Sequence, residues 1–163
     1  LTLQDFAQDK DGVHAALAKL NAAYLLSQDG KVQESLELYR QVSQLSGVPE
    51  IFGDYAMLSG LYLNLDTLAK NPDEAQTALD QAIILMNKEK SPWRYHARIV
   101  VAMIQGDLKN NPGEAVNTLR PILGENVQVP ESLRKRARSI SHVFALEQAA
   151  KVESSNKTDN PDG

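Results

Sequence analysis

Two stretches of the sequence decide the fold, NPDEAQTAL at residues 71–79 and NPGEAVNTL at residues 111–119. Asn, Pro, Glu, Ala and Leu recur at matching positions in both, at a spacing of 40 residues. Each stretch is a typical helix start, because proline in the first turn lacks only an N–H that would have no partner there. A further step of 40 residues toward the N-terminus reaches Glu34, Ser35 and Tyr39, again a small residue followed by a bulky one. The sequence therefore predicts three repeated helical units.

Breaker residues divide the rest of the chain into segments with helical periodicity. Asp29-Gly30 ends the first segment, because glycine tolerates the left-handed conformation of a helix C-cap, and Ser91-Pro92 opens the fifth. Between the breakers, apolar residues recur every three or four positions, and no stretch alternates as a half-buried strand does. We therefore expect seven helices, over about residues 13–28, 31–46, 49–69, 72–86, 91–108, 112–124 and 130–151.

The two ends of the chain give weaker patterns. The first helix is expected to begin near Val13, with Asp11 or Gly12 close to its N-cap. Its buried face is expected to carry four residues at helical spacing, Val13, Leu17, Leu20 and Tyr24. Residues 152–163 are polar and lack apolar periodicity, so we expect a disordered tail there, after a helical domain over residues 1–151.

The repeat also predicts how the helices assemble. Each hairpin has an apolar face that it cannot bury alone, so stacked hairpins form a continuous core. The small residues Ser35, Ala75 and Ala115 let the second helix of each hairpin approach the first. The expected fold is all-α, a tetratricopeptide-like right-handed stack of three hairpins with a period of about 40 residues, closed by a C-terminal helix. The usual tetratricopeptide unit has about 34 residues, so these units are divergent. A plain antiparallel bundle with an accidental repeat is the alternative.

Composition and charge argue against several classes of function. The length of 163 residues suits one domain, and a net charge of −4 offers no basic surface for nucleic acid. The chain has no cysteine, which excludes disulfides, thiolate catalysis and zinc bound by cysteine. No apolar run approaches the ~18 residues that a membrane-spanning helix needs.

No motif for catalysis is present. His14, His96 and His142 fall on three separate expected helices, without the spacing of a two-histidine metal site. Glycine-rich phosphate loops and the nucleophile elbow of hydrolases are also missing from the sequence. We therefore expect no catalytic residue, no cofactor and no metal ligand.

Two further features are interpreted as structural. Trp93, the only tryptophan, is expected to pack at a hairpin junction, with a binding hot spot as the alternative. The last expected helix begins with a basic run, Arg134, Lys135, Arg136 and Arg138. We interpret this run as a solvated face, with an acidic partner or lipid headgroups as the alternative. At least one of these cations should have a carboxylate partner, because positive charge is unfavourable at a helix N-terminus.

Three groups of residues carry a family resemblance. They are Ala16-Leu17-Ala18-Lys19-Leu20 with Ala23 and Gly30, Ser91-Pro92-Trp93-Arg94 with Ala97, and Gly106-Asp107 with Ala115, Leu119, Pro130 and residues 133–137. In this order, over about residues 11–146, they resemble the periplasmic tetratricopeptide-like domain of YfgM-type proteins, above all their alphaproteobacterial branch. Those proteins are ancillary subunits of the bacterial SecYEG translocon. The connection after Gly106-Asp107 departs from the family pattern by being four residues longer.

The resemblance implies a location and a kind of partner. It implies an inner-membrane protein anchored by one N-terminal helix, which would precede Leu1, with this domain on the periplasmic side. There it would contact translocon subunits and periplasmic chaperones, and hold or hand over translocated envelope proteins. The resemblance implies no catalytic residue. A tetratricopeptide assembly factor of outer-membrane biogenesis and a cytosolic helical-repeat adaptor are the alternatives.

A protein-binding groove is expected along the first helices of the hairpins, since these usually line the concave side of such a stack. Polar and aromatic residues at those positions are the candidates for contacting a bound protein. Our candidates are Asn21, Tyr24, Tyr62, Arg94 and Arg98.

Overall fold

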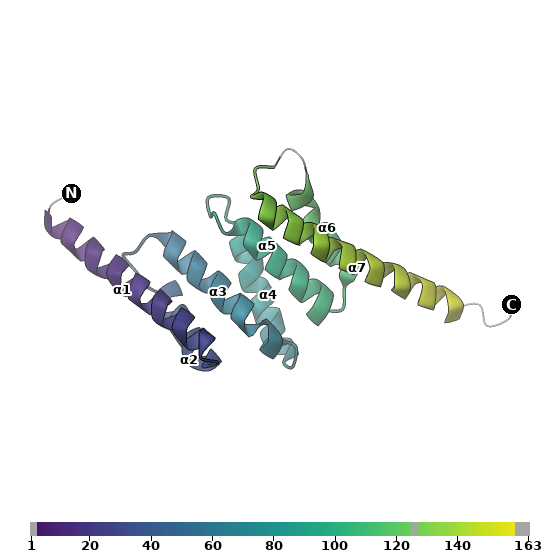
Figure 1. The fold of residues 1–163 in the computed structure, drawn as a ribbon, viewed down its shortest axis with the longest axis horizontal. Coiled ribbons are helices and arrows are strands. Elements are labelled where there is room, and N and C mark those ends of the chain that lie inside the picture. Colours follow the sequence, from purple (N-terminus) through teal and green to yellow (C-terminus); the bar gives the residue numbers. More distant parts are fainter. Residues whose placement is uncertain (1–2, 125–126, 159–163) are drawn as a thin grey trace.

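A computed structural model describes residues 3–124 and 127–158, with side chains for residues 12–124 and 127–155 (Figure 1). Every regular element in these ranges is a helix, which confirms the all-α class. The elements are α1 (Leu3–Gln28), α2 (Val32–Ser43), α3 (Glu50–Leu68), α4 (Pro72–Met86), α5 (Arg94–Met103), the π-helical turn η1 (Ile104–Leu108), α6 (Pro112–Leu123) and α7 (Glu131–Thr158). No helix in the described part of the chain is both long and apolar enough to cross a bilayer.

The helices form two layers along an elongated molecule. Figure 1 shows α1, α3, α5 and α7 running in similar directions along one side, with α2, α4 and α6 behind them. Each helix packs against the next in the chain, and contacts also join α1 to α3, α3 to α5 and α5 to α7. The front layer is therefore a continuous surface made by every second helix.

The recurring Asn-Pro motifs begin α4 and α6 as the sequence predicts. The side chains of Asn71 and Asn111 accept hydrogen bonds from the backbone N–H groups of Glu74 and Glu114, at 3.5 and 3.2 Å. Each asparagine also donates through Nδ2 to the carboxylate of that same glutamate, at 2.7 and 2.9 Å. The first bond satisfies one of the backbone donors that a helix start leaves free, and the second holds the asparagine side chain in place, which explains why Asn and Glu recur three residues apart.

The small residues of the repeat lie where the helices of a hairpin approach each other. Ser35, Ala75 and Ala115 are all buried, with exposed fractions of 0, 2 and 0%. The Ser35 hydroxyl donates to the backbone oxygen of Ala23 at 2.7 Å, so this contact joins α2 directly to α1. For Ser35 the expected contact between the paired helices is confirmed, and for Ala75 and Ala115 the structure shows their burial.

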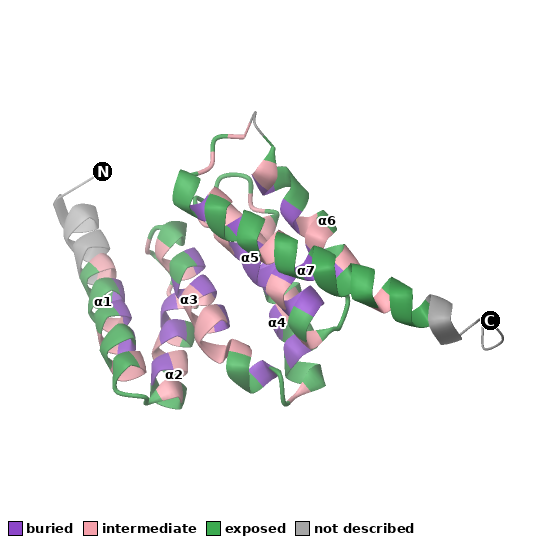
Figure 2. Cartoon of the chain, turned by 45° about the vertical axis from the view of Figure 1, so that its right-hand side comes forward, coloured by how far each residue is buried: buried purple, intermediate pink, exposed green. Residues whose placement is uncertain are grey.

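The hydrophobic core consists of three clusters that share helices. One lies between α1, α2 and α3, the next between α3, α4 and α5, and the last between α5, α6 and α7. Figure 2 shows the buried residues on the helix faces that meet in these places. Because α3 and α5 each contribute to two clusters, the core continues along the molecule.

The first helix differs from the expectation in its start and in its buried face. It begins at Leu3, so Asp11 and Gly12 lie inside it and do not cap it. Leu17 and Tyr24 are 47 and 54% exposed. Leu20 is buried as expected, and the other buried residues in the described part of this helix are Ala16 and Ala23. Two alanines on this face allow the close approach of α2 that the Ser35 hydrogen bond requires.

The expected lengthening between the fifth and sixth helices begins inside the fifth. Residues 104–108 form the π-helical turn η1, in which the Lys109 N–H bonds to the Ile104 oxygen at 2.9 Å. A side chain at Gly106 would have its Cβ only 2.2 Å from the Phe144 ring. The wide turn and the missing side chain thus make room for a bulky residue of α7.

The C-terminal segment also differs from the expected disordered tail. The last helix, α7, continues to Thr158, so residues 152–158 are helical, while residues 159–163 lie outside the described chain. No glycine or proline interrupts residues 131–158. Lys151 donates to the Asn110 backbone oxygen at 2.6 Å, which anchors this half of α7 to the η1–α6 connection.

Candidate protein-binding groove

Aromatic side chains gather on the face formed by α1, α3 and α5. They line a groove of about 460 Å³, to which α2 contributes one residue from behind. The lining includes four of the five tyrosines of the chain and its only tryptophan. We call this feature the aromatic groove, and its ring-bearing residues are Tyr24, Tyr39, Tyr55, Tyr62, Trp93 and His96.

Trp93 lies at the centre of these rings, at the start of α5. Its ring centroid lies 5.1 Å from that of Tyr55, with the planes tilted by 48°, and 5.6 Å from that of His96, edge to face. The indole N–H donates to the backbone oxygen of Ile51 at 3.3 Å. Aromatic pairs in such tilted arrangements are favourable, so the three rings stabilise one another's positions in the groove.

An ion cluster beside Trp93 holds the start of α3 to the α4–α5 connection. Lys88 Nζ lies 2.7 Å from a carboxylate oxygen of Asp54 and 2.7 Å from one of Glu50. The hydrogen bond to Asp54, followed by the one to Glu50, raises the pKa of Lys88. Asp54 is only 4% exposed and directly precedes Tyr55. The cluster therefore helps to position Tyr55 against Trp93.

The ionisation of Tyr39, the residue that α2 contributes to the groove, depends on its burial and on the other tyrosines. The Tyr39 side chain is buried, and this burial is the main reason that its pKa is raised. The nearby hydroxyls of Tyr55 and Tyr24 raise the pKa further, and a hydrogen bond with Ser59 partly opposes them. Because Tyr24 and Tyr55 are 54 and 37% exposed, their rings are available to a bound molecule.

A cation from α7 lies at the Tyr62 end of the aromatic groove. The Arg136 guanidinium lies over the Tyr62 ring, 5.0 Å from its centroid. The Tyr62 hydroxyl donates to the His96 backbone oxygen at 3.4 Å. His96 Nδ1 is buried and has no hydrogen-bond partner among the described residues. Burial, followed by the charge of Arg136, lowers the pKa of His96.

The lining of the aromatic groove carries no charged residue type among the described residues. This is notable in a chain of which 23% of residues are charged. A neutral surface of aromatic faces and hydroxyl tips can bury apolar side chains and still satisfy polar backbone groups. The arrangement is suited to holding a polypeptide segment. In the described residues, no group of His, Asp and Glu side chains is placed to bind a metal ion.

The structure places the five candidate groove residues in different parts of the molecule. Tyr24 and Tyr62 line the aromatic groove, and Asn21 is exposed one helical turn before Tyr24 without lining it. Arg94 and Arg98 line a different pocket of about 310 Å³, together with residues of α4 and α6. A helix turns by about 100° per residue, so both arginines lie on the side of α5 opposite His96.

The two arginines are also engaged within the protein. Arg94 Nη1 donates to the Glu89 backbone oxygen at 2.9 Å, and its guanidinium lies 4.6 Å from the Tyr95 ring centroid. Arg98 Nη1 donates to the Thr118 backbone oxygen at 3.3 Å. They connect α5 to its neighbours, so the structure does not group them with Tyr24 and Tyr62.

The candidate set does not include four of the ring-bearing residues of the groove, Tyr39, Tyr55, Trp93 and His96. It also lacks Arg136, which lies over Tyr62 at the end of the groove without lining it. Tyr55 and Tyr62 lie seven residues apart on one face of α3, and this spacing is a signal that could have found Tyr55. The basic run was interpreted as solvated, and Lys135 and Arg138 are indeed exposed. Arg134 has the expected carboxylate partner, Glu131, at 3.9 Å.

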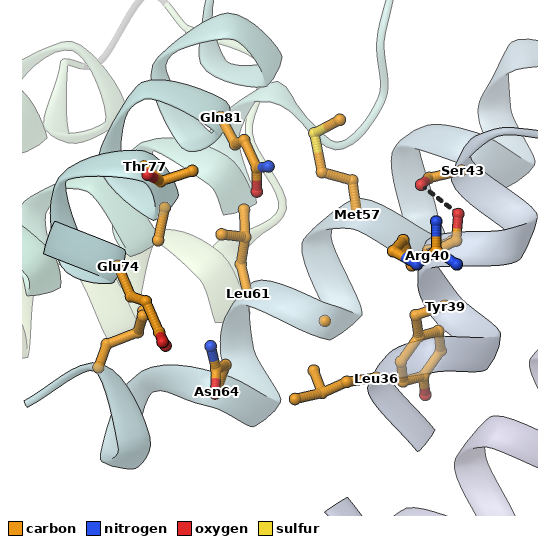
Figure 3. A pocket seen from close by; sticks show the side chains of 14 residues that line it. Leu36, Tyr39, Arg40, Ser43, Met57, Leu61, Asn64, Glu74, Thr77 and Gln81 are labelled. Carbon is orange, nitrogen blue, oxygen red and sulfur yellow. Dashed lines mark hydrogen bonds between the residues drawn. The ribbon is translucent and has the colours of Figure 1, made fainter. Parts of the chain in front are cut away.

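Besides the aromatic groove and the pocket at Arg94 and Arg98, a further pocket of about 350 Å³ lies between α2, α3 and α4 (Figure 3). Figure 3 shows Leu36 and Arg40 of α2 on one side, Thr77 and Gln81 of α4 on the other, and Leu61 of α3 between them. The aromatic groove shares one lining side chain with this pocket, the Tyr39 ring. Tyr39 therefore separates the two hollows.

The chain matches no protein-family model, no curated protein and no solved structure.

Proposed function

We propose that this chain is a non-catalytic protein-interaction module that holds segments of other proteins in the aromatic groove. The observation that carries the proposal is the gathering of partly exposed tyrosines and the only tryptophan in one uncharged groove. Aromatic residues with a polar tip are enriched in protein interfaces, because they bury a large area and keep a hydrogen-bonding group.

The architecture that we propose is a tetratricopeptide-like stack of three hairpins, α1–α2, α3–α4 and α5–α6, closed by α7. Three observations support it: the recurring helix starts, the small buried residue in each hairpin, and core clusters that share α3 and α5. In such a stack the first helices of the hairpins make one extended surface, and here that surface carries the aromatic groove.

The cellular role that we propose follows the family resemblance. The chain would be the periplasmic domain of a translocon-associated protein of the bacterial inner membrane, which holds or hands over translocated envelope proteins. The support is the set of YfgM-like segments, one of which includes Trp93. Its partners would be translocon subunits, periplasmic chaperones or translocated clients.

The experiment is affinity purification of the tagged full-length protein from gently solubilised membranes, with mass spectrometry of the bound proteins. We expect translocon subunits or periplasmic chaperones with the wild type, and a marked loss with Tyr24→Ala combined with Tyr55→Ala. Ile84→Ala is the matched control, because Ile84 is 59% exposed on α4 and does not line the groove.

Three outcomes would count against the proposal. Equal recovery by the tyrosine variant and the wild type would show that the groove does not bind the partners. Recovery of cytosolic proteins alone would favour the adaptor alternative, and recovery of outer-membrane assembly proteins would favour the assembly-factor alternative.

A further inference from the structure

We infer that the ligand of the aromatic groove is a proline-containing segment in the polyproline II conformation, with a carboxylate that reaches Arg136. This inference rests on the proposed function and specifies the partner of the same groove. It is carried by the tilted rings, the neutral lining and the single cation at the Tyr62 end.

The ring geometry suits proline side chains. Tyr55, Trp93 and His96 succeed one another at 5.1 and 5.6 Å, with interplanar angles of 48 and 64°. Rings in such contact present differently inclined faces and edges to a ligand that packs on top of them. A pyrrolidine ring is compact, apolar and rigid, and grooves lined by aromatic rings are the usual binding sites of polyproline II segments.

The backbone of such a segment also finds partners in the groove. A polyproline II helix has three residues per turn and no internal hydrogen bonds, so its carbonyl groups remain free to accept. The hydroxyl groups of Tyr24 and Tyr55 are donors on partly exposed rings at the groove surface. Proline itself has no N–H, so the ligand needs few acceptors from the protein.

Other binding modes fit the groove less well. Strand addition requires a free sheet edge, and the described part of the chain contains no strand. An α-helical ligand would need a groove two or more turns long. The volume of about 460 Å³ corresponds to roughly one turn of a helix about 10 Å wide.

The charge of the ligand follows from Arg136. No carboxylate among the described residues forms an ion pair with Arg136, whose guanidinium instead lies over the Tyr62 ring. The groove lining carries no acidic residue type that could attract a cationic ligand. An acidic residue beside the proline-containing stretch would pair with Arg136, whereas a lysine there would be repelled.

Trp93 provides a direct test, because the only tryptophan of the chain lies in the groove. The intact chain is titrated with a short peptide of repeated Pro-Pro-Glu units, and the intrinsic fluorescence is recorded. The control peptides, of equal length, contain repeated Pro-Pro-Lys or Ala-Ala-Glu units. We expect saturable binding of Pro-Pro-Glu, about fivefold weaker binding of Pro-Pro-Lys and no saturable response to Ala-Ala-Glu.

Protein variants then assign the contacts. Arg136→Gln should abolish the discrimination between the two proline peptides, whereas Lys135→Gln, one residue away and also exposed, should preserve it. Tyr55→Ala should weaken the binding of both proline peptides. Tyr55→Phe should keep the contact of the ring with the peptide and lose only the hydrogen bond of the hydroxyl group. Thermal melting of each variant separates lost binding from lost folding.

The affinities of the three peptides separate the proline requirement, the role of Arg136 and the proposed function. Equal affinity for the Ala-Ala-Glu and Pro-Pro-Glu peptides would overturn the proline requirement, and equal affinity for the two proline peptides would overturn the role of Arg136. If no proline peptide binds but protein capture still depends on Tyr24 and Tyr55, the proposed function stands and this inference falls. If capture also ignores both tyrosines, the proposed function falls as well.

Discussion

At the scale of single residues, Trp93 connects the core with the aromatic groove. Its indole ring packs against the core cluster between α3, α4 and α5, and its N–H is held by the Ile51 backbone oxygen at 3.3 Å. The same ring contacts Tyr55 and His96 in the groove. The core packing expected for Trp93 is confirmed. A role of this residue in binding a partner protein stays a prediction.

His96 should make the stability of the fold depend on pH. Because burial and Arg136 lower the pKa of His96 in the folded chain, the unfolded chain binds that proton more readily. The free energy of unfolding should therefore fall as the pH drops from about 6.5, the pKa of an unperturbed histidine, through the lower folded-state pKa. Urea unfolding at several pH values should show a shallower fall for His96→Gln. His142→Gln, at an exposed position, should behave as the wild type, and identical slopes for all three proteins would contradict this expectation.

Gly106→Ala should destabilise the fold through a single methyl group. The new Cβ would lie 2.2 Å from the ring of Phe144, which is 2% exposed and has little room to move. We expect a loss of about 1–3 kcal/mol in the free energy of unfolding, measured by chemical denaturation. Gly113→Ala is the matched control. Its Cβ would meet only the flexible Gln148 side chain, at 3.3 Å, so its effect should be near neutral. A loss as large for Gly113→Ala would refute the steric explanation.

At the scale of the helices, the Asn-Pro caps should stabilise α4 and α6 unequally. Replacing a capping asparagine by alanine costs about 1 kcal/mol. The hydrogen bond that Asn111 accepts is 3.2 Å long and the one that Asn71 accepts is 3.5 Å long, so Asn111→Ala should cost more. Chemical denaturation measures both losses. Asn117→Ala, at an exposed position inside α6, should be neutral or slightly stabilising. Equal effects at all three positions would argue against capping.

The sequence predicts helix starts best where a helix begins with breaker and capping residues. Asn71-Pro72 and Asn111-Pro112 determine the starts of α4 and α6 locally, so no knowledge of the neighbours is needed. The start of α1, the end of α7 and the turn η1 have no such signal. In the π-helical turn, Gly106 packs against Phe144, 38 positions further along the chain. A contact between residues so distant in sequence cannot be predicted from helical periodicity.

The aromatic groove was predictable only in part, for a similar reason. Tyr24 and Tyr62 were predicted from their positions on first helices of hairpins. Arg94 and Arg98 were chosen by the same rule, but the rotation of α5 directs them to the opposite side. The rotation of α5 depends on which of its apolar residues pack against α4 and α6, a property of the assembled helices.

At the scale of the whole molecule, a substitution in one of the three core clusters should destabilise mainly the helices of that cluster. Ile122 is fully buried in the cluster between α5, α6 and α7, so Ile122→Ala should cost about 2–5 kcal/mol. Hydrogen exchange should show the largest loss of protection in α5, α6 and α7, and the smallest in α1 and α2, because each unit contacts mainly its neighbours. Uniform loss across all helices would indicate a single bundle and would contradict a stack of repeats.

We propose that the aromatic groove binds other proteins. Site-specific photocrosslinking in intact cells shows whether a protein contacts this groove. A photoreactive amino acid replaces Tyr24, 54% exposed in the groove, or Ile84, 59% exposed on α4 outside it. We expect crosslinked proteins from position 24 and few or none from position 84. Equal crosslinking from both positions, or crosslinking from position 84 alone, would contradict the claim.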